Sequence, residues 1–328
     1  NSTIETWNKA TKKLVLVGEL FPNSIEQKYW DALANDPSVV VLTEKTSNLH
    51  HPTFIDQIDT LITPFTDEDF KAFQPEILLT FGGMVVSKRI KTFLRKYKPK
   101  HHWHIDSWRA YDTFGALTKH FEVTPNVFFD AFLPLTNATE SNYFQQLNAV
   151  KVLRKLKSDF YLSKIPFSDF KVFEKVIQRL PMNSQLQISN SSAIRYAQLI
   201  DIDPSIDVYC NRGTSGIDGS TSTAIGAAVA NKKQTIFITG DISFLYDSNA
   251  LWNNYIPKNF KIILINNGGG GIFRILPGHE ESPVFNTFFE TSHCLTAEHL
   301  AKMYGFEYGI ASDETSLVTS LNALYAQN

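Results

Sequence analysis

The sequence lacks the features that mark several large classes of protein. Its 328 residues include only two cysteines, Cys210 and Cys294, which share no metal-binding or redox spacing in a chain too long to need a disulfide. The formal net charge is only -2, so electrostatics gives no reason to expect nucleic acid or an anionic membrane as a partner. No apolar run approaches the roughly 18 residues of a membrane-spanning helix, and no basic-then-apolar signal segment opens the chain. We therefore expect a cytoplasmic protein without an integral membrane segment.

The composition is that of a globular protein with more than one core. Hydrophobic residues make up 43% of the chain and charged residues 20%, and 328 residues exceed what one core usually holds. Short apolar runs alternate with helical patterns in both halves, which predicts parallel sheets covered on both faces. A long helical stretch followed by Pro166 separates the halves. We therefore predict an α/β fold of two doubly wound parallel-sheet domains, residues 1–160 and 161–328.

Oxygen-bearing side chains follow two apolar strands of the second half. The strand from Gln234 to Thr239 leads into Gly240-Asp241, and the strand from Lys261 to Ile265 leads into Asn266-Asn267 and four glycines. A carboxylate, an amide oxygen and closely approaching backbone carbonyls suit a hard cation such as Mg²⁺ holding a diphosphate. The alternative is two ordinary strand-to-loop turns, since Gly-Asp and Asn-Gly are common turn dipeptides.

Other polar turns of this half also follow predicted strands. Asn190-Ser191 follows one strand, and the glycine-rich loop from Arg212 to Gly219 follows another. The carboxyl ends of parallel strands line the ligand crevice of a doubly wound sheet, so these turns should converge with Asp241 and Asn267. The glycines of the loop are spaced Gly-x-x-Gly-x-x-Gly, which is the wrong order for a dinucleotide fingerprint, and we reject NAD binding.

Two patterns in the first half also have a functional interpretation. His102 and His104 alternate onto one face of a short strand, and such a pair can ligate zinc, although spacing places no third ligand. Gly82-Gly83 ends a strand, and Lys88 and Arg89 open the next helix. A glycine turn before a helix N-terminus is a usual place for anions, and a plain surface helix start is the alternative.

Four motifs together resemble one branch of the thiamine diphosphate enzymes. In chain order the motifs are SNSSAIR from Ser189, NRGTSGIDGSTSTAIG from Asn211, GDISFLYDSNAL from Gly240 and the NNGGGGIF loop. This order is typical of that branch. The chain is similar to the 2-succinyl-5-enolpyruvyl-6-hydroxy-3-cyclohexene-1-carboxylate synthases of menaquinone biosynthesis. The resemblance implies that residues 1–160 are a middle domain, similar to a transhydrogenase nucleotide-binding domain but binding no nucleotide. Residues 161–328 would be the diphosphate-binding domain.

The resemblance implies a cofactor site with thiamine diphosphate and Mg²⁺, or Mn²⁺. Members of the family decarboxylate 2-oxoglutarate and add its succinyl part to isochorismate. The metal ligands would be Asp241, Asn267 and the carbonyl of Gly269, and Ile217 would be the apolar wedge that folds the cofactor. The cofactor-binding set that the resemblance implies comprises Asn190, Gly216, Ile217, Gly240, Asp241, Ile242, Ser243 and Asn267.

The resemblance also implies the substrate contacts. Ser191, Arg195 and Arg212 match contacts to the distal carboxylate of 2-oxoglutarate, which a planar guanidinium can grip with two parallel hydrogen bonds. For any single arginine, a surface ion pair is the alternative. The remaining substrate-binding residues would be Lys88 and Arg89 at the isochorismate carboxylates, and Ile272, Phe273 and Leu276 in an apolar wall.

Two departures from the family pattern affect these expectations. The family commonly has Asn or Asp where this chain has Gly268, so we expect a more pliant metal loop. The glutamate that activates the cofactor belongs to an N-terminal pyrimidine-binding domain, contributed by a second subunit of a homo-oligomer, and we find no such domain in this sequence. Since the first residue is Asn1 and the final helix has no strand after it, we expect a truncated piece, inactive alone, with no certain catalytic residue of its own.

Two other functions stay open at the level of sequence. A different thiamine-dependent decarboxylase or carboligase, such as an acetolactate synthase, would share Asp241 and Asn267 but should lack both arginines of the substrate turns. A non-catalytic scaffold module would keep the sheets and need no metal. Titration with thiamine diphosphate and Mg²⁺ separates the scaffold from the enzymes.

Overall fold

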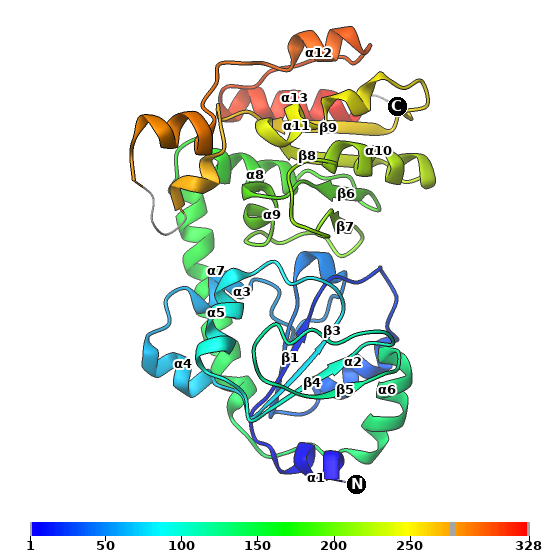
Figure 1. Ribbon diagram of the computed structural model, residues 1–328, viewed down its shortest axis with the longest axis vertical. Coiled ribbons are helices and arrows are strands. Elements are labelled where there is room, and N and C mark those ends of the chain that lie inside the picture. The colour runs from blue at the N-terminus through cyan, green and yellow to red at the C-terminus, as the bar shows by residue number, and fades with distance from the viewer. Residues whose placement is uncertain (1, 276–279, 327–328) are drawn as a thin grey trace. The chain divides into compact units, whose positions relative to one another are not determined.

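The computed structural model describes residues 2–275 and 280–326 (Figure 1). The chain divides into two compact units, residues 1–164 and 165–328. Residue 160, the boundary predicted from the sequence, lies four residues before the end of the long helix α7 (Tyr143–Lys164). No helix within the described residues is both long and apolar enough to cross a membrane.

The first unit is built on a five-stranded sheet in which all neighbouring strands are parallel. The strand order is β2-β1-β3-β4-β5. Strands β1 to β3 are buried along their whole length, as apolar runs such as KLVLV require when helices cover both faces. The strands are β1 (Lys13–Val17), β2 (Val39–Leu42), β3 (Ile77–Phe81), β4 (His101–Ile105) and β5 (Leu117–Phe121).

Helices cover both faces of this sheet, because alternate strand residues supply two separate cores. Val15 and Phe81 pack with one set of helices, and Leu14 and Leu78 pack with the other set. One face carries α1 (Ser2–Lys9), α2 (Gln27–Ala34) and α6 (Pro125–Phe132), and the other carries α3 (Ile58–Ile62), α4 (Asp67–Phe73), α5 (Lys88–Lys96) and α7. Short 3-10 turns, η1 (Lys45–Ser47) and η2 (Leu133–Leu135), lie in the connections.

The second unit contains a four-stranded parallel sheet with the order β7-β6-β8-β9. Its strands are β6 (Gln185–Ile188), β7 (Asp207–Cys210), β8 (Thr235–Gly240) and β9 (Phe260–Ile265). Strands β8 and β9 are in register from Thr235 and Phe260 to Gly240 and Ile265, so both end at the same edge. The predicted α/β class, with two parallel sheets, and the predicted neighbourhood of these two strands are confirmed.

Helices also lie on both sides of the second sheet. On one side, α10 (Ser220–Ala230) and α12 (Glu298–Met303) form a core with Phe237 of β8 and Phe244 of α11 (Asp241–Tyr246). On the other side α9 (Ser192–Ala197) contacts β8, α8 (Asp169–Ile177) contacts α9, and α13 (Glu314–Ala326) contacts α8. The remaining short segments are η3 (Ser248–Trp252), η4 (Gly271–Ile275) and a π-helical turn, η5 (Phe285–Glu290).

The two histidines of β4 lie beside Thr80 on the neighbouring strand β3. The hydroxyl of Thr80 lies between the two rings, 2.9 Å from His102 Nε2 and 2.8 Å from His104 Nδ1. Among the described residues, no group of three His, Cys, Asp or Glu side chains could hold a metal ion. Burial of the His102 ring lowers its pKa to about 4, so the ring is neutral at neutral pH.

This buried histidine predicts a pH-dependent stability. The pKa of His102 is about 4 in the folded chain and about 6.5 when unfolded, so the unfolded chain takes up more protons between these values. Its contribution to the free energy of unfolding should be present above pH 6.5 and be lost as pH falls toward 4, by about 3 kcal/mol. Urea unfolding of His102→Gln should show a shallower loss over this range than the unmodified chain. The control is His101→Gln on the same strand, and equal pH slopes for the two variants would contradict the assignment.

Candidate functional site

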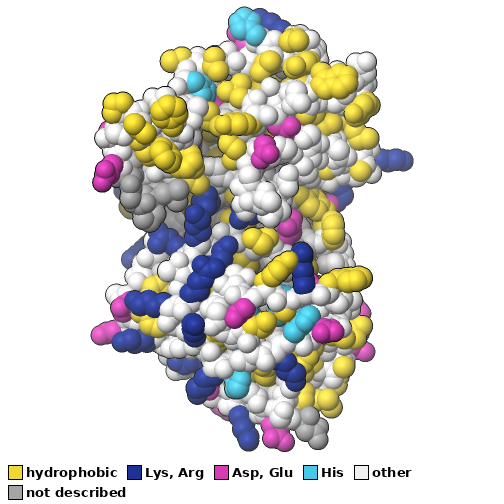
Figure 2. Space-filling model, viewed as in Figure 1, with side chains coloured by type: hydrophobic (Ala, Val, Ile, Leu, Met, Phe, Trp, Pro, Cys, Tyr) yellow, Lys and Arg dark blue, Asp and Glu magenta, His cyan; other side chains and the backbone are white. Residues whose placement is uncertain are grey.

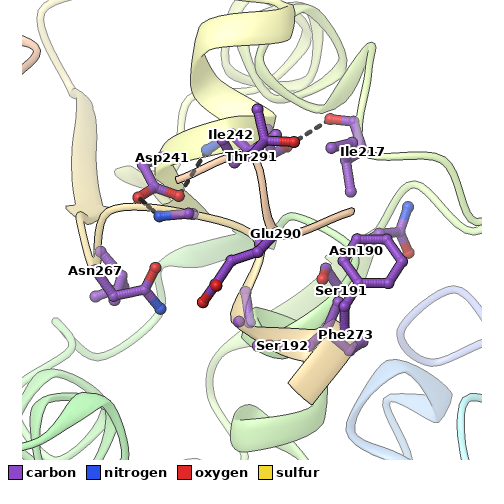
Figure 3. Close-up of a pocket in the computed structure, with 18 of the residues that line it drawn as sticks. Asn190, Ser191, Ser192, Ile217, Asp241, Ile242, Asn267, Phe273, Glu290 and Thr291 are labelled. Atoms are coloured by element: carbon purple, nitrogen blue, oxygen red, sulfur yellow. Dashed lines mark hydrogen bonds between the residues drawn. The ribbon is translucent and has the colours of Figure 1, made fainter. Parts of the chain in front are cut away.

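The polar turns of the second unit meet at a cavity of about 380 Å³ at the carboxyl ends of the strands (Figure 3). Its wall comes from the segments that follow β6, β8 and β9, together with the loop at Gly216 and Ile217. The predicted convergence of these turns is therefore observed. The predicted site residues that line the cavity are Asn190, Ser191, Gly216, Ile217, Gly240, Asp241, Ile242, Ser243, Asn267, Gly269, Ile272 and Phe273.

Asp241 is the buried acid of this cavity, at the junction of β8 and α11. Its Oδ1 accepts a hydrogen bond from the N–H of Ile242 at 2.7 Å, and its Oδ2 accepts from the N–H groups of Gly268 and Gly269 at 2.8 and 3.0 Å. Only 4% of the residue is exposed. Three backbone donors therefore stabilise the carboxylate charge, and they fasten the glycine loop after β9 to the end of β8.

The backbone of the glycine loop passes so close to a neighbouring segment that there is little room for side chains. Gly268 has φ of 80°, and a Cβ there would approach the carbonyl oxygen of His293 to 3.1 Å. A Cβ on Gly269 would come within 2.9 Å of the carbonyl oxygen of Glu290. The carbonyl oxygen of Gly268 accepts a hydrogen bond from the N–H of His293 at 3.0 Å. The N–H of Gly270 donates to the backbone carbonyl oxygen of Glu290 at 2.6 Å. The segment from Glu290 to His293 thus packs directly against the loop.

His293 brings a ring nitrogen to the acid. Its Nε2 lies 3.2 Å from Asp241 Oδ2 without hydrogen-bond geometry, and this nitrogen atom is itself buried. The sequence motifs gave no role to His293 or to Glu290. Neither stands at a strand end or in a recognised spacing, so no sequence signal pointed to them.

Asn267 precedes the four glycines of the loop after β9 and lines the cavity together with Asp241. Its Nδ2 donates to Asp169 Oδ2 at 2.7 Å, and Asp169 comes from the first turn of α8. The metal ligands expected from the sequence are the carboxylate of Asp241, the amide oxygen of Asn267 and the backbone carbonyl of Gly269. All three are hard oxygen donors of the kind that Mg²⁺ prefers, and the residues present fit that cation.

The opposite wall is tied together through Asn190. This buried side chain donates from Nδ2 to the carbonyls of Asn211 and Gly216, at 2.5 and 2.6 Å, and accepts at Oδ1 from Arg212 Nη1 at 2.9 Å. The hydroxyl of Ser243 donates to the carbonyl of Ile217 at 2.5 Å. The loop that carries Ile217 is therefore fixed to the ends of both β6 and β8, and Figure 3 shows Ile217 facing the cavity across from Phe273.

The two predicted substrate arginines donate hydrogen bonds to residues that line the cavity. Arg195 Nη1 donates to the carbonyl of Ser191 at 3.0 Å, while Arg212 is buried and bonded to Asn190. The Nε of Arg212 finds no hydrogen-bond acceptor within the described part of the chain. Ser191 itself has φ of 74°, a conformation that costs a non-glycine residue free energy and that is concentrated at functional sites.

Phenylalanines form the apolar rim beside the glycine loop. Phe273 of η4 meets Phe289 of η5 edge to face, with ring centroids 6.0 Å apart. Arg274 clasps the carboxylate of Glu290 at 2.6 and 2.5 Å, which holds η4 and η5 together. Apolar side chains gather over this part of the second unit in Figure 2, and Phe288 is 76% exposed. Leu276 lies outside the described residues.

Lys88 and Arg89 belong to the first unit, where they open α5 as exposed side chains. The predicted anion position at this helix start is already occupied by a carboxylate of the chain. Glu44 accepts hydrogen bonds from the N–H groups of Val86 and Ser87, at 2.6 and 2.8 Å. Burial raises the pKa of Glu44 to about 7. The backbone donors before α5 are therefore engaged, while the two basic side chains point outward.

Comparisons with known proteins cover nearly the whole chain. Residues 1–188 match a family model described as the middle domain of thiamine pyrophosphate, and residues 191–327 match the C-terminal TPP binding domain of thiamine pyrophosphate enzymes. Three similar proteins are 2-succinyl-5-enolpyruvyl-6-hydroxy-3-cyclohexene-1-carboxylate synthases. They come from Flavobacterium johnsoniae (69% identical over 99% of this chain), Christiangramia forsetii (53% over 98%) and Porphyromonas gingivalis (32% over 98%). The chain spans 59%, 57% and 57% of their lengths.

The geometry predicts that Asp241 is required for metal-dependent binding. Asp241→Ala should abolish Mg²⁺-dependent binding of thiamine diphosphate, because no other carboxylate of the donor set can take its place. Calorimetric titration of the chain combined with a pyrimidine-binding domain, with and without Mg²⁺, measures this, and far-UV circular dichroism should show an intact fold. Glu298→Ala, which removes a surface carboxylate of the same unit, is the matched control. An unchanged titration for Asp241→Ala would refute the metal assignment.

Proposed function

Because the chain belongs to the thiamine pyrophosphate enzymes, we propose that it supplies the middle and cofactor-binding domains of a 2-succinyl-5-enolpyruvyl-6-hydroxy-3-cyclohexene-1-carboxylate synthase. The observation that carries this proposal is one cavity lined by Asp241, Asn267 and Gly269 together with the apolar side chains of Ile217 and Phe273. The relatives that share up to 69% of its residues support the same function. The proposed reaction joins 2-oxoglutarate, with loss of carbon dioxide, to isochorismate.

Asp241, Asn267 and the Gly269 carbonyl would hold Mg²⁺ or Mn²⁺, which neutralises the diphosphate of the cofactor. Thiamine diphosphate supplies the electron sink for the carbon that loses carbon dioxide. The carboxylate is held before any ligand arrives, since three backbone N–H groups fix its orientation. Such preorganisation lowers the cost of binding, because the chain does not have to order this group when the cofactor enters.

Ile217 would be the apolar wedge under the cofactor. Its backbone carbonyl is held by Ser243 and its loop by Asn190, so the wedge cannot withdraw without breaking two hydrogen bonds. Ser243 and Asn190 thus act on the cofactor through Ile217 as well as through the cavity wall. Ile272 and Phe273 would line the reacting centre with side chains that exclude water.

Basic side chains would bind the substrate carboxylates. Arg195, Arg212 and Ser191 would meet the distal carboxylate of 2-oxoglutarate, and the Nε of Arg212, which has no acceptor within the described residues, leaves a donor for it. Lys88 and Arg89 of the first unit would meet the carboxylates of isochorismate. Charge-assisted bonds of this kind are about twice as strong as neutral ones and fix orientation.

The proposed reaction also needs an activating glutamate from a pyrimidine-binding domain, which we assign to a second subunit of a homo-oligomer. Support for such a domain comes from the relatives, whose chains are longer than this one. We use the term complete enzyme for this chain together with a pyrimidine-binding domain. Its partners would then be the two small acids and a second copy of itself.

Substrate specificity in the complete enzyme should depend on the two arginines. Loss of one charge-assisted contact costs about 1.5–3 kcal/mol, so Arg195→Ala or Arg212→Ala should reduce kcat/KM for 2-oxoglutarate by roughly 10- to 150-fold. Pyruvate lacks the distal carboxylate, and whatever rate it supports should change little. Steady-state kinetics with both acids measures the difference. Equal losses with both would instead assign the arginines a structural role.

The 328-residue chain by itself should fold and yet show no carboligase turnover. Without a pyrimidine-binding domain, the cofactor would be held mainly through its diphosphate and metal, so binding of thiamine diphosphate should be weak or undetectable. The exposed apolar rim at Phe273 and Phe288 should favour self-association, which ultracentrifugation can detect. Product formed from 2-oxoglutarate and isochorismate by this chain alone, with thiamine diphosphate and Mg²⁺, would contradict the proposal that a pyrimidine-binding domain is needed for turnover.

A further inference from the structure

We propose that Asp169 is a positioning residue that orients the amide of Asn267, so that the amide oxygen is presented to the metal. The inference rests on the proposed function and adds to it a residue that none of the sequence motifs contains. Asp169 begins α8, and 98 residues separate it from Asn267 in the sequence. Both side chains line the same cavity.

The hydrogen bond between these side chains determines which end of the amide faces the metal. Asn267 Nδ2 donates to Asp169 Oδ2 at 2.7 Å. An amide carries its oxygen and its nitrogen on opposite ends of one planar group, so anchoring the nitrogen fixes the direction of the oxygen. Figure 3 shows the oxygen of Asn267 on the side nearer Asp241 and the nitrogen on the far side. The anchored amide therefore presents its oxygen on the side of the other proposed ligands.

Asn267 needs such an anchor because, within the described residues, its side chain makes no other hydrogen bond. The residue is exposed and is followed by four glycines, which offer no side chains to pack against it. The terminal torsion of an asparagine is broad and roughly two-fold, so a free amide also turns its N–H groups toward the metal position, where they repel a cation. The preceding residue is held differently, because Asn266 Nδ2 donates to the carbonyl of Leu295 at 2.8 Å.

Two other roles for Asp169 predict different consequences. As an acidic residue in the first turn of α8, it can stabilise the helix through the helix dipole. That role changes the stability of the chain and leaves metal affinity unaltered. As a negative charge near the cation, it can attract the metal directly, and that role is lost whenever the charge is lost. Orientation of Asn267 needs only a hydrogen-bond acceptor, which an asparagine also provides.

The test measures Mg²⁺ affinity of the complete enzyme at saturating thiamine diphosphate, by tryptophan fluorescence, with free Mn²⁺ by electron paramagnetic resonance as a second readout. Removing the partner that orients a metal ligand typically costs 10- to 100-fold in affinity, so Asp169→Ala should weaken Mg²⁺ binding by about tenfold or more. Asp169→Asn should bind Mg²⁺ nearly as tightly as the unmodified enzyme. Glu298→Ala, which removes the first-turn carboxylate of α12, is the matched control and should change nothing.

The outcomes separate this inference from the proposed function. Unchanged affinity in Asp169→Ala would overturn the inference and leave the proposed function standing. Equal losses in the Ala and Asn variants would overturn it too, because charge and not orientation would be responsible. Absence of any metal-dependent cofactor binding by the unmodified enzyme would overturn both. If Asp169→Ala folds poorly, Asp169→Ser repeats the test, since serine suits a helix start and its shorter side chain does not reach Asn267.

Discussion

The second unit depends on one buried carboxylate held by three backbone N–H groups. Asp241 directly follows β8, and its hydrogen bonds to Gly268 and Gly269 join that strand end to the loop that follows β9. A buried charge without such partners would be costly. At Gly268 and Gly269, the carbonyl oxygens of His293 and Glu290 leave little room for a Cβ atom. Acid, loop and the covering segment therefore form one connected structure beside the cavity.

The carboxyl ends of the parallel strands are filled by the chain in the first unit and line a cavity in the second unit. In both, polar groups gather at the carboxyl ends of parallel strands. In the first unit the stretch 43–48 after β2 is buried, and Glu44 satisfies the N–H groups of Val86 and Ser87. That edge is filled by the chain itself. In the second unit the equivalent groups, Asp241 and Asn267, line a cavity that is open to a ligand. Binding of the cofactor accordingly falls to the second unit.

The sequence was informative wherever the signal is local. Apolar runs such as QTIFIT identified the strands, and the residues directly after them, Asp241 and Asn267, identified the cavity. It could not show contacts made by segments far apart in the chain. Asp169 and His293 stand outside every strand end and motif, and only the packing of α8 and of the segment after η5 brings them to the loop. Glu44 was missed for the same reason, since its partners lie more than forty residues away.

We propose that Asp241, Asn267 and Gly269 together hold the metal of a thiamine diphosphate site. A crystal structure of the complete enzyme grown with thiamine diphosphate and Mn²⁺ tests this most directly, because anomalous scattering locates the ion independently of the chain tracing. We expect one peak, about 2.0–2.3 Å from a carboxylate oxygen of Asp241, the amide oxygen of Asn267 and the carbonyl oxygen of Gly269. A peak away from these three atoms, or a diphosphate bound without an ion there, would contradict it.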